Sequence, residues 1–340
     1  MAPPLALVTG ATGFIGSHLT PALLAGGWQV RACGRRARPD GLPATVDYHR
    51  VDLAADDALG DLVAGVTHLF HLAGASSSNA DQAQMQRDNV VATERLLSAV
   101  PAGQLERLVH MSSTSVYGEE RALPVPVPED VEPTPSRGYG KAKWETELVV
   151  RSAAAAGLPA AVLRPVSVYG PGNVKLLASV ILDVALEAAG GAAALAVPAA
   201  PVEQRLVHID DLVAATVHVA RADDAVGGTF NVVDGLYPSS HEVAGLVAGQ
   251  FALEVDLADD PDCGPAWPER QRLHEAAVAA GMVPAIFLTE QRFRFMRKAN
   301  RNNRLSTDAL AATGFCFTQT DLPGALARTV AWYRRAGWLP

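Results

Sequence analysis

The sequence TGATGFIG, residues 9–16, directly follows an apolar run at residues 5–8 and opens a stretch of helical character. At such a turn a strand reverses into a helix whose free N–H groups face an anion, and residues without a Cβ allow the close approach. Gly10 suits the tight turn, Gly13 the contact with a phosphate, and Gly16 the packing of helix on strand. The segment therefore predicts a dinucleotide-binding turn. The other residues expected beside the bound molecule are Thr12, Phe14 and Ile15.

Composition and charge narrow the class of protein. The 340 residues are 49% hydrophobic, enough for one large domain or two cooperating ones. A formal net charge of −8 disfavours a broad nucleic-acid-binding surface, which needs clustered Lys and Arg. Residues 1–4 lack a basic n-region, and charges or glycines interrupt the later apolar runs, so we expect a cytoplasmic protein without a membrane anchor. The few, distant cysteines and the unpatterned histidines predict no disulfide and no metal site.

Short apolar segments alternate with helical ones along the first half of the chain. The strand candidates are residues 5–8, 29–33, 66–72, 105–111 and 160–163. The helix candidates are residues 13–25, 56–64, 81–100 and 139–156. This alternation predicts an α/β fold with a Rossmann-type, doubly wound parallel sheet.

The regular alternation ends near Gly172, where a smaller, mixed α/β substrate-binding part is expected to begin. One return to the sheet is expected, with a strand at 206–209, a helix to Ala220 and a strand at 229–233. The Pro-dense segment 123–135 predicts a stiff loop between two halves of the site. The expected division is a dinucleotide-binding domain at 1–168, with 205–235 returning to it, and a substrate-binding part at 169–204 and 236–340.

Hydroxyl groups gather just after the strand candidate 105–111, at the edge where open α/β sheets bind ligands. Among them Ser113 is the candidate site residue. Tyr139 and Lys143 are four residues apart at the start of a helix, which places both side chains on one face. A nearby ammonium favours phenolate over phenol, so the pair predicts a lowered pKa for Tyr139 and a role as acid or base.

These motifs resemble the extended short-chain dehydrogenase/reductase family, the NAD-dependent epimerase/dehydratase-like group of nucleotide-sugar epimerases, dehydratases and ketoreductases. They occur in the family's order and cover about the first half of the chain, with weaker similarity at 207–211 and 230–232. The segments that carry the resemblance are residues 9–16, 51–53, 71–74, Asn89, 112–113 with 116–118, Tyr139 with Lys143, and 164–165 with 168–172.

The resemblance implies a role for each of these residues. Tyr139 would exchange a proton with the substrate oxygen, and Ser113 would hydrogen-bond the same oxygen. Lys143 would hold the ribose hydroxyls, and Asn89 would help a water connect Lys143 to solvent. The residues expected to contact the adenine are Asp52 and Leu53, and those expected to line the cofactor are Leu72, Ala73, Gly74, Pro165 and Val168. The resemblance also implies a homodimer formed through the helices around 89–99 and 139–156.

The end of the second strand candidate bears on the choice of dinucleotide. An acidic residue there would bind the ribose 2′-hydroxyl and repel a 2′-phosphate, but the sequence instead continues Gly34-Arg35-Arg36. Two guanidinium groups can bind a phosphate in bidentate fashion, which predicts NADP over NAD. The alternative is that Arg35 and Arg36 lie on a solvated loop. An NADP preference favours net reduction, because family members that return hydride to the same substrate usually retain NAD.

Two segments point to different substrates. A basic cluster could clasp a diphosphate or form a solvated helix face; its members are Arg292, Arg294, Arg297, Lys298, Arg301 and Arg304. Residues 192–202 are small and apolar, which suits a flatter, polyketide-like or steroid-like carbonyl compound. We expect an NADP-preferring oxidoreductase that reduces a ketone, or oxidises the secondary alcohol, of a small molecule such as a nucleotide-linked keto sugar or a natural-product intermediate. The alternatives are a nucleotide-sugar epimerase with tightly bound NAD and a non-catalytic dinucleotide-sensing protein.

Overall fold

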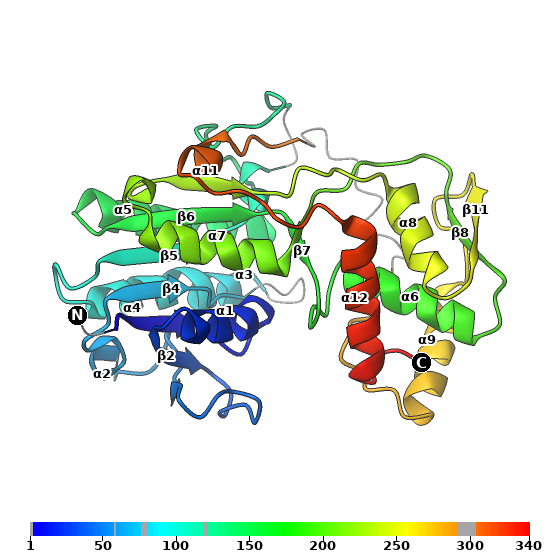
Figure 1. Ribbon diagram of the computed structural model, residues 1–340, viewed down its shortest axis with the longest axis horizontal. Coiled ribbons are helices and arrows are strands. Elements are labelled where there is room, and N and C mark those ends of the chain that lie inside the picture. Colours follow the sequence, from blue (N-terminus) through cyan, green and yellow to red (C-terminus); the bar gives the residue numbers. More distant parts are fainter. Residues whose placement is uncertain (1–2, 58, 76–80, 119–121, 291–303) are drawn as a thin grey trace. The chain divides into compact units, whose positions relative to one another are not determined.

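The chain folds into two compact units, as the computed structural model in Figure 1 shows. The structure describes residues 3–57, 59–75, 81–118, 122–290 and 304–340. The first unit comprises Met1–Val166, Asp210–Val233 and Leu305–Cys316, and the second comprises Ser167–Ile209, Asp234–Arg304 and Phe317–Pro340. The sequence-based division assigned 236–340 to the substrate-binding part, whereas Leu305–Cys316 packs with the first unit. There Leu305 forms a β-bridge with Val127.

The first unit is built on a seven-stranded sheet of order β10-β6-β5-β4-β1-β2-β3, in which every pair of neighbours is parallel. Its strands are β1 (Leu5–Thr9), β2 (Gln29–Gly34), β3 (Asp47–Arg50), β4 (His68–His71), β5 (Arg107–Met111), β6 (Ala160–Pro165) and β10 (Thr229–Val232). The predicted Rossmann-type sheet is confirmed. The strand order reverses between β1 and β4, and open α/β sheets bind ligands at the carboxyl ends of strands at such a point.

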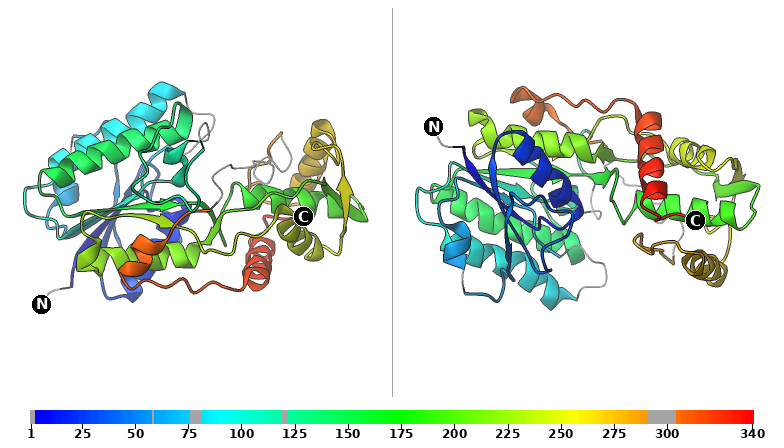
Figure 2. Two further views of the ribbon diagram at one scale, coloured as in Figure 1. Left: turned by 90° about the horizontal axis from the view of Figure 1, so that it is seen from above. Right: turned by 60° about the horizontal axis from the view of Figure 1, so that its bottom comes forward.

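Helices cover both faces of this sheet. They are α1 (Phe14–Ala25), α2 (Leu59–Val63), α3 (Gln82–Met85), the π-helix η1 (Gln86–Val91), α4 (Ala92–Ala99), the 3-10 helix η2 (Thr114–Tyr117), α5 (Gly138–Ala155), α7 (Ile209–Arg221), the 3-10 helix η3 (Asp223–Ala225) and α11 (Asp308–Ala312). Figure 2 shows α4 and α5 on one face and α1 and α7 on the other. On the α5 face, Leu7, Leu69 and Leu108 of the sheet share a buried cluster with Leu96 and Val150 of the helices.

The second unit contains two short parallel strand pairs and four described helices. The pairs are β7 (Ser167–Tyr169) with β9 (Leu206–His208), and β8 (Ala194–Pro198) with β11 (Glu254–Ala258). The helices are α6 (Leu177–Ala189), α8 (Ser240–Gly249), α9 (Trp267–Ala279) and α12 (Leu322–Arg335). The strand expected at 206–209 therefore pairs with β7 and not with the main sheet. Between β7 and β9 the rings of Tyr169 and His208 pack edge to face, with centroids 5.1 Å apart.

Two elements of the first unit differ from the sequence-based expectation. Strand β3, with the sequence DYHR, was not predicted, because a polar strand at the edge of a sheet lacks an apolar signal. The helix expected at 81–100 is interrupted, since η1 separates α3 from α4. This interruption places Asn89 in a π-helical turn.

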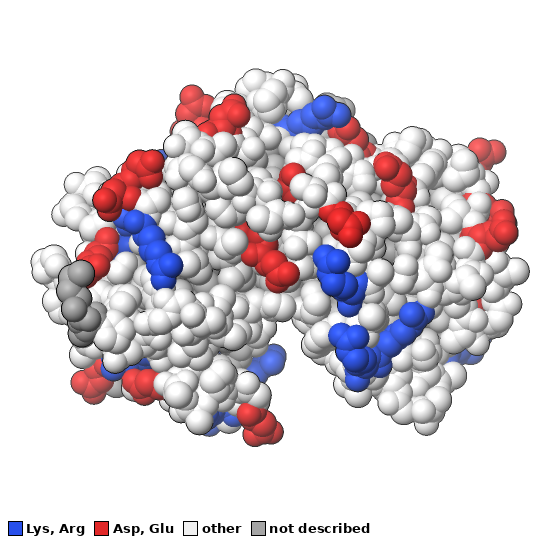
Figure 3. All heavy atoms as spheres, in the orientation of Figure 1, with Lys and Arg blue, Asp and Glu red and all other residues white. Residues whose placement is uncertain are grey.

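The described residues contain no helix both long and apolar enough to cross a membrane. On the face of the molecule drawn in Figure 3, acidic and basic side chains are interspersed, and the basic ones form small clusters rather than one continuous basic surface. This distribution agrees with the net charge of −8.

Candidate active site and dinucleotide site

The glycine turn joins β1 to α1 at the point where the strand order reverses. Gly10 has a φ of +69°, and a Cβ there would lie 2.9 Å from the backbone nitrogen of Ala73. A Cβ at Gly16 would lie 2.6 Å from Ala11 Cα, so no side chain fits between the turn and the helix. Gly13 caps α1 without a side-chain acceptor, which leaves the first N–H groups of the helix to an anion. This turn fits the diphosphate of a dinucleotide.

Ser112 and Ser113 are adjacent but have different partners. The buried Ser112 hydroxyl donates to Glu147 Oε1, and Glu147 also pairs with fully buried Arg164 at 2.8 Å. Ser113 Oγ accepts hydrogen bonds from the Ser115 backbone N–H at 3.2 Å and the Ser115 hydroxyl at 2.8 Å, so its own proton remains for Tyr139. Ser113 is therefore the hydroxyl that shares a site with Tyr139, while Ser112 belongs to a buried ionic network.

Tyr139 and Lys143 occupy the first turns of α5. The Lys143 ammonium lies 5.9 Å from the centroid of the Tyr139 ring and donates to the Met111 carbonyl at 2.8 Å. Burial raises the pKa of Tyr139 to about 12, although the Ser113 hydrogen bond opposes the shift. Burial lowers the pKa of Lys143 to about 8, against the charge of Glu147. The Tyr139 pKa is thus raised and not lowered as the sequence predicted, because desolvation dominates.

Asn89 lies in the π-helix η1, a kind of turn that is frequent at functional sites. Its Nδ2 donates to the Met85 carbonyl at 2.9 Å, but among the described residues its buried Oδ1 has no hydrogen-bond partner. A Cβ built at Gly74 would lie against Asn89 Oδ1 and 3.5 Å from Lys143 Nζ, so the two polar groups flank the same space. A water bridging an orphaned acceptor and an ammonium would satisfy both, as the resemblance implies.

A directional chain of hydrogen bonds runs from Asn89 to the glycine turn. The Thr93 hydroxyl donates to the Asn89 carbonyl at 2.6 Å, so it accepts from His71 Nε2 at 2.8 Å. His71 Nδ1 then accepts from the Thr9 hydroxyl at 2.8 Å, which in turn accepts backbone N–H groups after β4. Burial lowers the pKa of His71 to about 3, in keeping with a neutral ring. The sequence analysis included His71 only as part of a motif, without a role.

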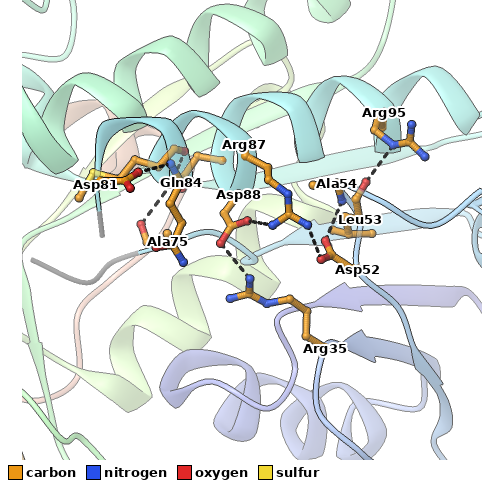
Figure 4. A network of polar contacts seen from close by, with 12 residues as sticks. Arg35, Asp52, Leu53, Ala54, Ala75, Asp81, Gln84, Arg87, Asp88 and Arg95 are labelled. Atoms are coloured by element: carbon orange, nitrogen blue, oxygen red, sulfur yellow. Dashed lines mark hydrogen bonds and ion pairs between the residues drawn. The ribbon is translucent and has the colours of Figure 1, made fainter. Parts of the chain in front are cut away.

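A charge network lies at the end of β2 (Figure 4). Arg35 Nη1 pairs with Asp88 Oδ2 at 2.8 Å, Arg87 pairs with Asp88 Oδ1 at 2.7 Å, and Arg87 also pairs with Asp52 at 2.6 Å. Arg36 is exposed and takes no part in this network. Sequence reasoning missed Arg87 and Asp88, because charged residues within a helix usually lie on its solvated face.

Asp52 and Leu53 follow β3, which is parallel to β2 and ends at the same edge of the sheet. Burial opposes ionisation of Asp52, but the hydrogen bonds from Arg87 and from the Ala54 N–H outweigh it and lower the Asp52 pKa. Leu53 is buried in the apolar cluster on the α5 face. Their expected contact with adenine stays a prediction.

The family comparison matches residues 6–233 to a model described as the NAD dependent epimerase/dehydratase family. The chain belongs to this family. The match covers more than half of the chain, and it confirms the resemblance to extended short-chain dehydrogenases/reductases that the motifs indicated. The dinucleotide of this epimerase/dehydratase chain is therefore NAD or NADP.

Characterised members of the family with similar sequences include two reductases. The chain is 31% identical over 179 residues to 4-hydroxy-2-methyl-3-oxo-4-farnesyl-3,4-dihydroquinoline-1-oxide ketoreductase of Stigmatella aurantiaca, a match that covers 51% of this chain and 53% of that protein. It is 29% identical over 265 residues to GDP-6-deoxy-D-mannose reductase of Pseudomonas aeruginosa, covering 75% of this chain and 82% of that protein.

Among solved structures of the family fold, MoeE5 in complex with UDP-glucose and NAD is similar over 97% of this chain and 99% of that one, at 28% identity and a TM-score of 0.71. The similarity extends over both units, which shows that the second unit also follows the architecture of MoeE5.

The remaining predicted residues lie in several elements, and their contacts with the cofactor stay predictions. Leu72, Ala73 and Gly74 follow β4, and Pro165 ends β6, whereas Val168 lies in β7 of the second unit. A Cβ at Gly34 would lie 3.3 Å from Thr12 Oγ1 and 3.0 Å from the Tyr48 hydroxyl, so Tyr48 is a neighbour of the turn that the sequence did not indicate. The residues after Gly13, Phe14 and Ile15, begin α1.

Of the two segments invoked for substrate choice, the structure describes the apolar one and only one residue of the basic one. Of the basic cluster, residues 292, 294, 297, 298 and 301 lie outside the described residues, and Arg304 pairs with Glu203 at 2.9 Å. Within the apolar stretch 192–202, Leu195 and Val197 of β8 are buried in the core of the second unit. Their apolar side chains therefore stabilise this unit instead of facing a ligand.

Proposed function

We propose that this protein is an NADP(H)-preferring oxidoreductase that reduces a ketone, or oxidises the matching secondary alcohol, of a small molecule. The observation that carries the reaction type is the cluster of Ser113, Tyr139 and Lys143 beside the carboxyl end of β5. A bound nicotinamide dinucleotide would supply or accept the hydride. The chain's own residues would handle the proton and the polarity of the substrate oxygen.

Tyr139 is the acid that gives a proton to the carbonyl oxygen as it becomes a hydroxyl. Ser113 can hydrogen-bond the same oxygen if its hydroxyl proton, directed toward Tyr139 in the structure, turns to the carbonyl oxygen, while Ser113 Oγ still accepts from Ser115. Lys143 stabilises the phenolate that remains, provided that its ammonium turns from the Met111 carbonyl toward the ribose and Tyr139. Asn89 Oδ1 is placed to hold a water that returns the proton from solvent.

The preference for NADP rests on the end of β2. No acidic residue occurs in β2 or in residues 34–36, and the Arg35 guanidinium is held at that strand end by Asp88. A fixed guanidinium favours a 2′-phosphate, whereas a ribose 2′-hydroxyl usually meets a carboxylate there. NADPH use in turn supports net reduction, and both named reductases above are relatives of the chain.

A second candidate is a nucleotide-sugar epimerase that retains NAD. The similarity to MoeE5, solved with UDP-glucose and NAD, favours it, because that similarity covers 97% of this chain. A small-molecule substrate and a homodimer are common to both candidates.

One experiment separates them. The freshly purified protein is denatured and any released dinucleotide is identified by mass spectrometry, while the emptied protein is titrated with NADPH and NADH. Clear preference for NADPH supports the reductase. Retained NAD without an NADPH preference overturns it in favour of the epimerase.

A further inference from the structure

We propose that Asp88 is a positioning residue that holds the Arg35 guanidinium ready for the 2′-phosphate of NADP. This inference rests on the NADP preference proposed above, and it adds a residue from the π-helix η1 to the strand-end arginine. Figure 4 shows the two side chains approaching each other from these two elements.

The burial of the two partners differs in a way that suits this role. The Asp88 side chain is 5% exposed, whereas that of Arg35 is 57% exposed. Arg35 uses Nη1 for Asp88, and in the described part of the chain its Nε and Nη2 have no hydrogen-bond partner. An immobile carboxylate thus fixes one edge of an otherwise mobile side chain and leaves donors for an incoming anion. Because a long arginine side chain loses rotamer entropy on binding, fixing it beforehand strengthens the capture of a phosphate.

The Asp88 carboxylate positions Arg35, but its negative charge would also repel a phosphate. Which of these two effects is larger depends on the partner of its second oxygen. That oxygen accepts from Arg87 at 2.7 Å, and Arg87 is held in turn by Asp52 at 2.6 Å. The four charges alternate in sign from Asp52 to Arg35, with the positive end at the exposed arginine. The four charges sum to zero, but Asp88 shares its negative charge between two guanidinium groups, so the exposed end that meets an anion is positive.

The buried carboxylate lies within the π-helix η1. In η1 the consecutive residues Asp88 and Asn89 are both buried, Asp88 beside Arg35 and Asn89 beside Lys143. One turn of helix therefore serves both the strand-end arginine and the candidate active site. A substitution that preserves the shape of Asp88 is needed to test one function without disturbing the other.

The test measures the dissociation constants of NADPH and NADH by fluorescence titration for the full-length protein and its variants. Asp88→Asn keeps the side-chain shape but loses the charged acceptor, and we expect NADPH binding to weaken by about tenfold while NADH binding changes by less than about twofold. Asp57→Asn is the matched control, because it removes the same charge from the fully exposed partner of Arg95. It should leave both constants unchanged.

A double-mutant cycle separates this inference from the proposed function. Arg35→Gln alone tests the function: unchanged NADPH affinity would remove the NADP site. If Arg35→Gln weakens NADPH binding, Asp88→Asn should add no further loss in that background. An equal loss in both backgrounds, an equal effect on NADPH and NADH, or tighter NADPH binding by Asp88→Asn would overturn the role of Asp88 alone.

Arg87→Gln provides a second test should Asp88→Asn fail to fold, because the Arg87 side chain is 45% exposed. Without Arg87 the charge of Asp88 is unbalanced and competes with the phosphate for Arg35. NADPH binding should then weaken by several-fold without a matching change for NADH. Unaltered NADPH affinity in Arg87→Gln would contradict the proposed balance of charges.

Discussion

The Lys143 ammonium donates a 2.8 Å hydrogen bond to the carbonyl of Met111, the last residue of β5. This bond ties helix α5 to the carboxyl end of a central strand, where the dinucleotide of related folds binds. Lys143 is only 5% exposed, so under the proposed function its ammonium has only to turn from the Met111 carbonyl toward an incoming ribose. The ammonium does not have to be drawn from solvent when the cofactor arrives.

Replacing Tyr139 by Phe should lower turnover about 100-fold or more, because the reaction loses its proton donor. The dissociation constant of NADPH should stay nearly the same, since only a hydroxyl group is removed. Steady-state kinetics and cofactor titration on the same preparation make the comparison. Unchanged turnover would remove Tyr139 from the mechanism.

The two adjacent serines should respond differently to alanine. Ser113→Ala removes the hydroxyl that bonds Tyr139 and should reduce kcat with little effect on thermal stability. Ser112→Ala leaves the buried Glu147 with one donor fewer, so it should lower stability by about 1–3 kcal/mol while the folded enzyme keeps its turnover. Melting curves and kcat values for both variants test the assignment. A larger loss of kcat in Ser112→Ala would reverse it.

Gly16→Ala should destabilise the protein by about 1–3 kcal/mol and weaken dinucleotide binding, because its Cβ would lie 2.6 Å from Ala11 Cα. Gly60→Ala in α2 is the matched control, since a Cβ there meets nothing within 4 Å. Removal of a helical glycine should stabilise the control slightly. Chemical denaturation and NADPH titration of both variants provide the measurement. A normally stable, tightly binding Gly16→Ala would contradict the close packing.

Stability should fall as the pH drops below about 6.5. Burial holds the pKa of His71 at about 3, and it also lowers that of His110, so the unfolded chain binds protons that the folded protein does not. Stability therefore increases with pH across the interval between the folded and unfolded pKa values, by up to about 1.4 kcal/mol per pH unit for each group. Urea unfolding at pH 7, 6 and 5 gives the slope. His71→Gln should show a smaller slope than the wild type, and an identical slope would count against a neutral His71.

The sequence predicts the parts of this site that depend on local chemistry. Three such features could be predicted, because each is defined by a few residues close in the chain: the glycine turn, the Ser113 hydroxyl and the spacing of Tyr139 and Lys143. The sheet is readable too, since buried strands leave continuous apolar runs.

The parts of the site that depend on residues distant in the chain could not be predicted from the sequence. Asp88 is a charged residue within a helix, a type that usually lies exposed, but here it is buried and pairs with two arginines, one of them more than fifty positions away. The Lys143 ammonium was expected to act on Tyr139, but the Met111 carbonyl holds it in the described structure. Both cases are set by tertiary packing rather than by spacing.

The chain passes between its two units at residues 166–167, 209–210, 233–234, 304–305 and 316–317. During synthesis on the ribosome, the first unit cannot acquire its segment Leu305–Cys316 until the intervening segments of the second unit have been made. For the same reason a single cut does not release either unit intact. A chimera that exchanges one terminal half with a relative mixes segments of both units, so a whole unit is exchanged only when all of its segments are exchanged together.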